Sequence, residues 1–169
     1  IIHIRKPGFN AEGYEQYLQT YNTLLPNFVL HEHHSFASKY PVKGIHLKER
    51  DRRNSNILDS NIKIISTSIH SIEDASKLTQ PFEYIFYSPL FESISKANYG
   101  SNNSEQALRD IVVKLKKHTT TPVIGLGGID ARNIVSVKKC GFDGAAVLGA
   151  VWENSDPIVA FENCLRLNA

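Results

Sequence analysis

The sequence has 169 residues, of which 41% are apolar and 21% are charged, a composition typical of one globular domain with a hydrophobic core. Its net charge of +2 is too small for a nucleic-acid-binding surface, so we expect no nucleic-acid partner. No run approaches the roughly 20 apolar residues of a membrane span, and we expect no membrane association. Cys140 and Cys164 lack the spacing of a metal or redox pair, which favours two reduced thiols in a cytoplasmic protein.

Seven short apolar runs rich in β-branched residues predict β-strands. These runs occupy residues 1–4, 28–32, 44–48, 63–69, 84–90, 122–127 and 144–150. Helical periodicity separates most of them, in segments that cover residues 11–24, 71–78, 104–117, 132–140 and 157–167. Ser71, with Asp74 three residues later, forms a capping box at the start of the second helix. Strands that alternate with helices, without hairpin turns, predict βαβ units and a parallel sheet.

A parallel sheet of this kind is either an open sheet or a closed barrel. Seven strands fit an eight-stranded (β/α)8 TIM barrel whose first βα unit is absent from the sequence, because a complete barrel needs roughly 200 residues or more. A Rossmann or flavodoxin-like open sheet is the alternative, but no G-x-G-x-x-G motif follows the first strand. We therefore expect a single α/β barrel domain over residues 1–169 that lacks its N-terminal βα unit.

The last two predicted βα loops carry glycines. In barrels, active groups lie at the carboxyl ends of the strands, and phosphate often binds at the last two of these loops. Here the loops contain Gly127-Gly128 and Gly149, and glycine lets backbone N–H groups approach an anion closely. Tight turns alone would also explain these glycines, but their presence in both loops favours a phosphate site.

The ends of the other predicted strands are polar. They carry Arg5 and Lys6, His31 and Glu32, Lys48 and Asp51, Ser68 and His70, and finally Ser93, Ser95 and Lys96. Cations, hydroxyls and one or two carboxylates at one mouth of a barrel suit a polyphosphate with Mg²⁺. A salt bridge that closes the barrel mouth is the simpler explanation for Arg5 by itself.

The run HEHH (31–34) also suggests zinc. Adjacent histidines on a strand point to opposite faces, however, so at most two of them could share a metal ion. A solvated loop is the simpler interpretation for His33 and His34.

Five motifs together carry a resemblance to a known family. They are GIHLKERD, STSIHSIEDA, SPLFESISK, PVIGLGGI and GFDGAAVLGA. Their order and spacing resemble those of the thiamine phosphate synthase family and its close relative, the thiazole tautomerase, from Ile1 to about Asn168. The resemblance implies a (β/α)8 barrel enzyme that joins a pyrimidine methyl diphosphate to a thiazole phosphate with Mg²⁺ and releases pyrophosphate.

The resemblance also implies roles for individual residues. Arg5 matches the arginine that holds the pyrimidine diphosphate, Asp51 matches a Mg²⁺ ligand, and Ser68 matches a serine of the following strand. The hydroxyl-x-hydroxyl-lysine element that grips diphosphate and thiazole phosphate corresponds to Ser93, Ser95 and Lys96. The cradle of the thiazole phosphate corresponds to Gly127, Gly128, Leu148 and Gly149.

Three departures from the family pattern keep an alternative open. Pro7 stands where the family has a second lysine, and His31-Glu32 replaces an Asn-Asp pair, although Glu32 could still bind Mg²⁺. Gly149 replaces a serine. These losses affect the diphosphate half of the site, so they leave open a thiazole tautomerase that uses His70 as its acid–base group. Asp51 and the Ser-x-Ser-Lys element favour the synthase.

Further interpretations lie outside this chemistry. A non-catalytic barrel that binds thiamine-related phosphates is one, and a sugar-phosphate isomerase or epimerase is another. Phosphorylated pyrimidine and thiazole compounds are the expected partners, and the sequence leaves a homodimer open.

Overall fold

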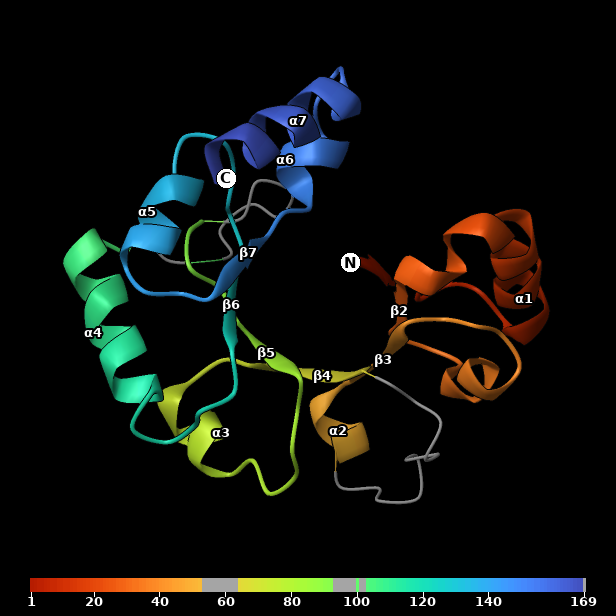
Figure 1. Cartoon of the computed structure of the whole chain (residues 1–169), viewed down its shortest axis with the longest axis horizontal. Helices are drawn as coiled ribbons and strands as arrows, with labels where there is room; N and C mark the ends of the chain where they lie inside the picture. The colour runs from red at the N-terminus through yellow and green to blue at the C-terminus, as the bar shows by residue number, and fades with distance from the viewer. Residues whose placement is uncertain (53–63, 93–99, 101–102, 169) are drawn as a thin grey trace. The chain divides into compact units, whose positions relative to one another are not determined.

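The computed structural model describes residues 1–52, 64–92, 100 and 103–168, and it forms two compact units, Ile1–Ser68 and Ile69–Ala169. Strands and helices alternate along the chain (Figure 1). Each predicted strand is present, with these bounds: β1 Ile2–Ile4, β2 Phe28–Leu30, β3 Gly44–Leu47, β4 Ile64–Ile69, β5 Tyr84–Tyr87, β6 Val123–Leu126 and β7 Gly144–Ala146. The prediction of a parallel α/β fold is therefore correct.

The strands pair with their neighbours in chain order. In the first unit, β1 pairs with β2, β2 with β3 and β3 with β4, all in parallel. In the second unit, β5 pairs with β6 and β6 with β7, again in parallel. The carboxyl ends of neighbouring strands within each unit therefore lie at the same edge of the sheet.

The predicted helices are also present. They are α1 Ala11–Thr20, α3 Ile72–Ser76, α4 Glu105–Leu115, α5 Ile134–Lys139 and α7 Pro157–Asn168. The sequence did not predict the single turns α2 Glu49–Arg52 and α6 Gly149–Trp152, or the 3₁₀ helices η1 Asn22–Asn27 and η2 His34–Ser38. One helical turn is too short for a periodic apolar pattern to mark it.

The two faces of the sheet in the first unit differ in chemistry. Ile4 and Leu30 belong to one buried apolar cluster with Tyr14 and Leu18 of α1 and Leu25 of η1. Side chains alternate between faces along a strand, so the neighbours of these residues point the other way. That opposite face, which we call the histidine face, carries His3, Arg5, His31, His46, Ser66 and Ser68.

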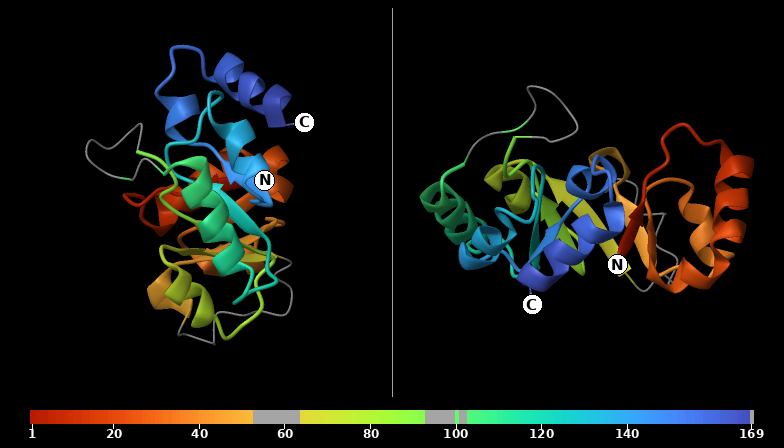
Figure 2. Two further views of the ribbon diagram at one scale, coloured as in Figure 1. Left: turned by 90° about the vertical axis from the view of Figure 1, so that its left-hand side faces the viewer. Right: turned by 90° about the horizontal axis from the view of Figure 1, so that it is seen from above.

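In the second unit, helices cover β5–β7. Leu108, Val112 and Leu115 of α4 are buried, and α4 and α5 lie side by side against these strands (Figure 2). Helix α7 contacts α5 and α6. Across the described segments, no helix combines the length and the apolar character that crossing a bilayer requires.

Candidate functional site

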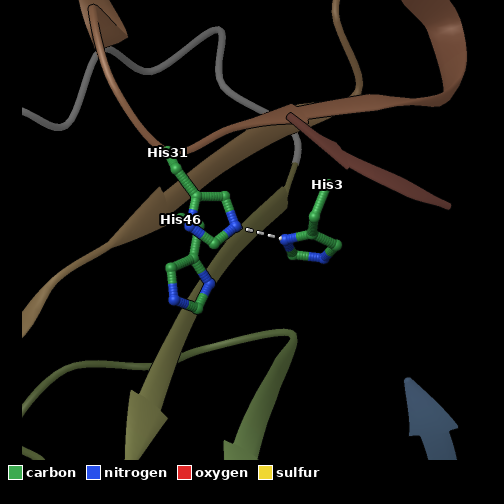
Figure 3. A group of neighbouring side chains, drawn as sticks. All are labelled: His3, His31 and His46. Carbon is green, nitrogen blue, oxygen red and sulfur yellow. Dashed lines mark hydrogen bonds between the residues drawn. The ribbon is translucent and has the colours of Figure 1, made fainter. Parts of the chain in front are cut away.

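Three imidazoles meet on the histidine face. The Nδ1 atom of His3 lies 2.8 Å from the Nε2 atom of His31, so one of the two donates a hydrogen bond to the other (Figure 3). The rings of His31 and His46 stack with their centroids 4.1 Å apart. The register places His46 opposite Ser66, and the ring nitrogens of His46 lie 2.9 Å from the hydroxyl of Ser66 and 3.0 Å from that of Ser68.

Burial keeps these imidazoles uncharged. It lowers the pKa of His46 to about 2, that of His3 to about 3 and that of His31 to about 4. Repulsion among the rings lowers the pKa values further, and the positive charge of Arg5 adds to the effect at His31. At neutral pH the cluster therefore offers lone pairs and N–H groups but no positive charge.

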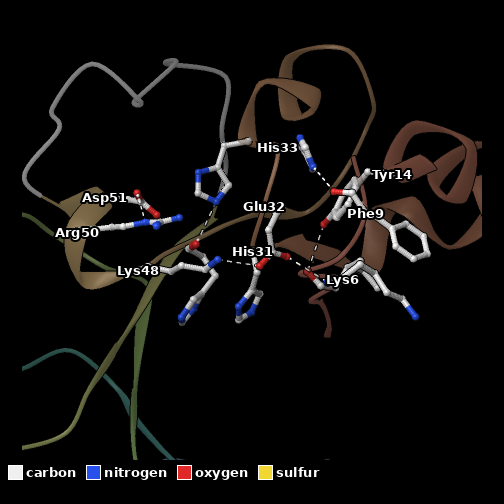
Figure 4. Close-up of polar contacts among 12 residues, drawn as sticks. Lys6, Phe9, Tyr14, His31, Glu32, His33, Lys48, Arg50 and Asp51 are labelled. Atoms are coloured by element: carbon white, nitrogen blue, oxygen red, sulfur yellow. Dashed lines mark hydrogen bonds and ion pairs between the residues drawn. The ribbon is translucent and has the colours of Figure 1, made fainter. Parts of the chain in front are cut away.

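Glu32 is held by two donors at the end of β2. Lys48 Nζ donates to its Oε1 at 2.8 Å, and the backbone N–H of Lys6 donates to its Oε2 at 3.2 Å (Figure 4). The Glu32 side chain is 14% exposed. A Mg²⁺ ion would have to compete with Lys48 for this carboxylate, so Glu32 suits the expected role of metal ligand poorly.

Asp51 lies on α2 and is better suited to bind a cation. Its Oδ1 is 3.4 Å from Nε of Arg50, whose side chain is 80% exposed, and such an exposed ion pair is weak. Its negative charge also acts on His34, where it opposes the effect of burial, which lowers the pKa. A single carboxylate that shares Mg²⁺ with substrate phosphate oxygens is a common arrangement, so Asp51 fits the ion.

The two basic residues after β1 point in different directions. Arg5 is exposed and belongs to the histidine face, where its charge acts on His31. The Nζ atom of Lys6 lies 5.0 Å from the ring centroid of Tyr17 on α1, in a cation–π contact. The Lys6 side chain therefore points toward α1, away from the histidine face.

The loop after β2 differs from its prediction. His33 and His34 are half-buried, and each ring contacts a backbone carbonyl at 3.1 Å, that of Phe9 and that of His46 respectively. A carbonyl only accepts hydrogen bonds, so both Nε2 atoms carry a proton. These contacts replace the predicted solvated loop, because the backbone turns into η2 directly after His33.

In the second unit, His70 is fixed at both its backbone and its ring. The carboxylate of Asp74 accepts the backbone N–H of His70 at 2.9 Å, and the same oxygen accepts the N–H of Ser71 in the predicted capping box. The ring Nδ1 donates to the carbonyl of Ser88 at 2.8 Å. In the neutral ring the lone pair therefore resides on Nε2, which is able to accept a proton.

Gly127 and Gly128 both have positive φ, at +99° and +62°. A side chain at Gly128 would place Cβ 2.3 Å from the carbonyl oxygen of Glu92, and one at Gly127 would place it 3.0 Å from Pro89. Close packing against the loop after β5 therefore also demands glycine here. The phosphate role of the pair remains a prediction.

Leu148 and Gly149 lie at the start of α6. Leu148 is 57% exposed, and Gly149 lines a cavity of about 340 Å³ together with Asp130, Arg132 and Glu153. Arg132 already forms an ion pair with Asp130. Ser93, Ser95 and Lys96 lie outside the described residues.

A family model described as thiamine monophosphate synthase matches residues 10–151. The chain belongs to this family. A thiamine-phosphate synthase of Prochlorococcus marinus is 29% identical over 150 residues, which cover 87% of this chain and 41% of that protein. One from Listeria welshimeri is 27% identical over 143 residues, which cover 82% of this chain and 67% of that protein. The chain thus spans less than half of the first relative and about two thirds of the second.

Solved structures support the same fold. A thiamine phosphate pyrophosphorylase from Pyrococcus furiosus superposes with a TM-score of 0.79 at 23% identity. The match covers 98% of this chain and 81% of the Pyrococcus chain. One from Bacteroides thetaiotaomicron gives a TM-score of 0.75 at 28% identity over 99% of this chain and 83% of its own. A 3-hexulose-6-phosphate synthase shares the fold alone. Its identity is 16% and its TM-score is 0.70, and the match covers 99% of this chain and 86% of that chain. The predicted class, an α/β fold of the (β/α)8 barrel type, is confirmed.

Sequence reasoning missed several groups in this family member. His3, His46 and Ser66 lie inside predicted strands, and nothing in the sequence indicated a functional role for them. Ser88 lies within a predicted buried strand and was likewise not identified. The alternation of side chains was the available signal, since His3 and Arg5 share a face, as do Ser66 and Ser68.

Proposed function

We propose that the chain is a thiamine phosphate synthase, which joins hydroxymethylpyrimidine diphosphate to thiazole phosphate and releases pyrophosphate in thiamine biosynthesis. The observation that carries the proposal is the family match over residues 10–151. Arg5 and Ser68 on the histidine face support it, as does Asp51 with its weak ion pair. The phosphorylated pyrimidine and thiazole compounds would be its small-molecule partners.

The reaction breaks the C–O bond to the diphosphate, and the ring nitrogen of the thiazole then forms a C–N bond with the pyrimidine methyl carbon. Negative charge gathers on the leaving oxygens during the first step. Arg5, Ser93, Ser95 and Lys96 would stabilise that charge, and one well-placed donor contributes roughly 3–4 kcal/mol in comparable sites. The backbone of Gly127, Gly128, Leu148 and Gly149 would hold the thiazole phosphate. No protein nucleophile is required.

Asp51 would hold Mg²⁺ in this scheme. The ion, when bound, would neutralise charge on the diphosphate oxygens. Glu32 would join it only after release from Lys48, which is the reason to rank Glu32 second.

The geometry of His70 favours one second candidate, thiazole tautomerase. That reaction moves a proton between two positions of the thiazole ring, and it needs a base that can also act as an acid. The Nε2 lone pair of His70, with Nδ1 engaged by Ser88, suits this role. The losses at Pro7 and His31 would not matter for a substrate without diphosphate.

Turnover distinguishes the candidates. A synthase must release pyrophosphate only when both substrates and Mg²⁺ are present, and Lys96→Ala should lower kcat more than it raises KM, because its charge acts mainly in the transition state. Lys117→Ala, at an exposed lysine after α4, serves as the control. If the unmodified chain forms no pyrophosphate but isomerises the thiazole in a His70-dependent manner, the tautomerase is correct. Binding of thiamine phosphate without either turnover would indicate a non-catalytic barrel.

A further inference from the structure

The three imidazoles of His3, His31 and His46 come from three neighbouring strands or strand ends. One nitrogen from each ring lies within 4.8 Å of the other two, and no other group of three or more His, Cys, Asp or Glu with this spacing occurs among the described residues. His46 is 3% exposed, while His3 and His31 are partly exposed. A cation could therefore reach the cluster from the side of His3 and His31.

Ordinary packing does not explain this cluster well. Large branched apolar side chains usually fill the corresponding face of a parallel α/β barrel. Three neutral imidazoles, each with one nitrogen within 4.8 Å of the other two, supply what a metal ion needs, namely several lone pairs without positive charge.

The chemistry of the ligands selects the ion. Neutral imidazole suits Zn²⁺ and its transition-metal neighbours, whereas Mg²⁺ prefers oxygen ligands and retains several waters. We propose that His3, His31 and His46 form a binding site for a divalent transition-metal ion of the Zn²⁺ type. This site is separate from the Mg²⁺ that Asp51 would hold, and it does not depend on the proposed reaction.

The surroundings of the rings support this assignment. Histidine ligands usually use their second nitrogen in a hydrogen bond that fixes the ring. At His46, one nitrogen can bind the metal while the other keeps its serine, Ser66 or Ser68. The 2.8 Å separation between His3 and His31 must widen to about 3.3 Å, because two nitrogens at about 2.05 Å from a tetrahedral ion are that far apart. The other nitrogens, up to 4.8 Å apart, must close to a similar distance, so the His31 and His46 rings must also turn out of their stack.

The test is direct binding to the full chain. Metal-free protein is titrated with ZnCl₂ and, separately, MgCl₂ by calorimetry, and bound zinc is counted after dialysis. Co²⁺ serves as a spectroscopic probe, since nitrogen ligands in a tetrahedral site give intense visible bands. The variants are His3→Gln and His31→Gln, which keep a polar side chain of similar size. His118→Gln, at an exposed histidine after α4, is the matched control.

We expect one zinc per chain, no competition by Mg²⁺, and a zinc-dependent rise in Tm. His3→Gln and His31→Gln should each weaken zinc binding by more than about tenfold, the loss that removal of even an outer-shell partner causes. The control should bind zinc as the unmodified chain does. Absence of zinc binding overturns the proposal, and so does equal affinity in the His3→Gln variant. Neither result depends on pyrophosphate release, so the proposed zinc site can be refuted while the proposed synthase function is retained.

Discussion

The glycines after β6 show how one residue can serve packing and chemistry together. Gly127 and Gly128 were predicted to cradle a phosphate, and the structure gives them a second reason to be glycine. Their positive φ values are strained for other residues, and the loop after β5 leaves no room for a Cβ atom at Gly128. A substitution at Gly128 is therefore expected to lower the stability of the fold, whatever its effect on phosphate binding.

Gly128→Ala should destabilise the protein by about 2–4 kcal/mol. The estimate combines the cost of a left-handed alanine with the cost of overpacking against the carbonyl of Glu92. Gly8→Ala is the control, because a Cβ there meets no atom within 4 Å and should change stability by less than about 1 kcal/mol. Urea unfolding measures both variants. If Gly128→Ala is as stable as the unmodified chain, the loop after β5 can move to accommodate the added Cβ atom.

Single polar residues inside strands were the hardest part of the site to predict. Arg5 and His70 directly follow strands, and Asp51 and Ser68 lie near the ends of β3 and β4, where a barrel places its chemistry, so their positions suggested a role. His3 and His46 lie inside short strands, and only the register reveals that they face one another. The sequence of a strand sets which residues share its face, but it does not set the alignment with the next strand.

At the scale of elements, the strands were easy to predict, in part because β2, β3 and β5 are buried on both faces. Runs such as Phe28–Leu30 and Tyr84–Tyr87 are continuous and apolar, which distinguishes them from loops without any knowledge of tertiary contacts. Their observed ends fall up to four residues short of the predicted ends, as at β7. Strand ends depend on where pairing stops, and that is a property of the neighbouring strand.

Helix α3 connects local structure to the candidate site. Its capping box uses Ser71 and Asp74, and the same Asp74 carboxylate holds the backbone of His70. The capping box that begins α3 therefore also fixes the backbone of His70.

Ser71→Ala should cost about 1 kcal/mol, as for other N-cap serines, and it should also loosen His70. Ser104→Ala removes the N-cap of α4, whose side chain accepts from Ala107, and should cost a similar amount. Urea unfolding gives both energies, and the NMR signals of the His70 ring report its position. We expect those signals to shift in Ser71→Ala alone. An unchanged His70 signal in that variant would mean that Ser88 alone fixes the ring.

At the scale of the whole molecule, the histidine face couples folding to pH. The pKa values of His3, His31 and His46 are lowered to about 3, 4 and 2, while an unfolded histidine has a pKa near 6.5. The folded protein keeps these rings neutral at pH 5.5, whereas the unfolded chain protonates them. The unfolded state then binds more protons, so stability must fall as the pH drops below about 6.5.

Between pH 7.5 and 5.5, each of these histidines should remove about 1 kcal/mol from the free energy of unfolding of the metal-free protein. Carboxylates with lowered pKa values, such as Asp130 and Asp143, affect stability only at lower pH, so this window isolates histidine. Nearby cations at Arg5 and Lys48 act in the same direction, and His34, whose pKa is also lowered by burial, adds to the total.

Urea unfolding in EDTA at the two pH values measures this loss in the unmodified chain and in the variants. His3→Gln and His31→Gln should each reduce the loss by about 1 kcal/mol, because glutamine does not titrate. The exposed His118→Gln should leave it unchanged. If His3→Gln retains the full loss, its ring is not held neutral in the folded state. The imidazoles would then carry protons at pH 5.5, and their lowered pKa values could not be the source of acid sensitivity.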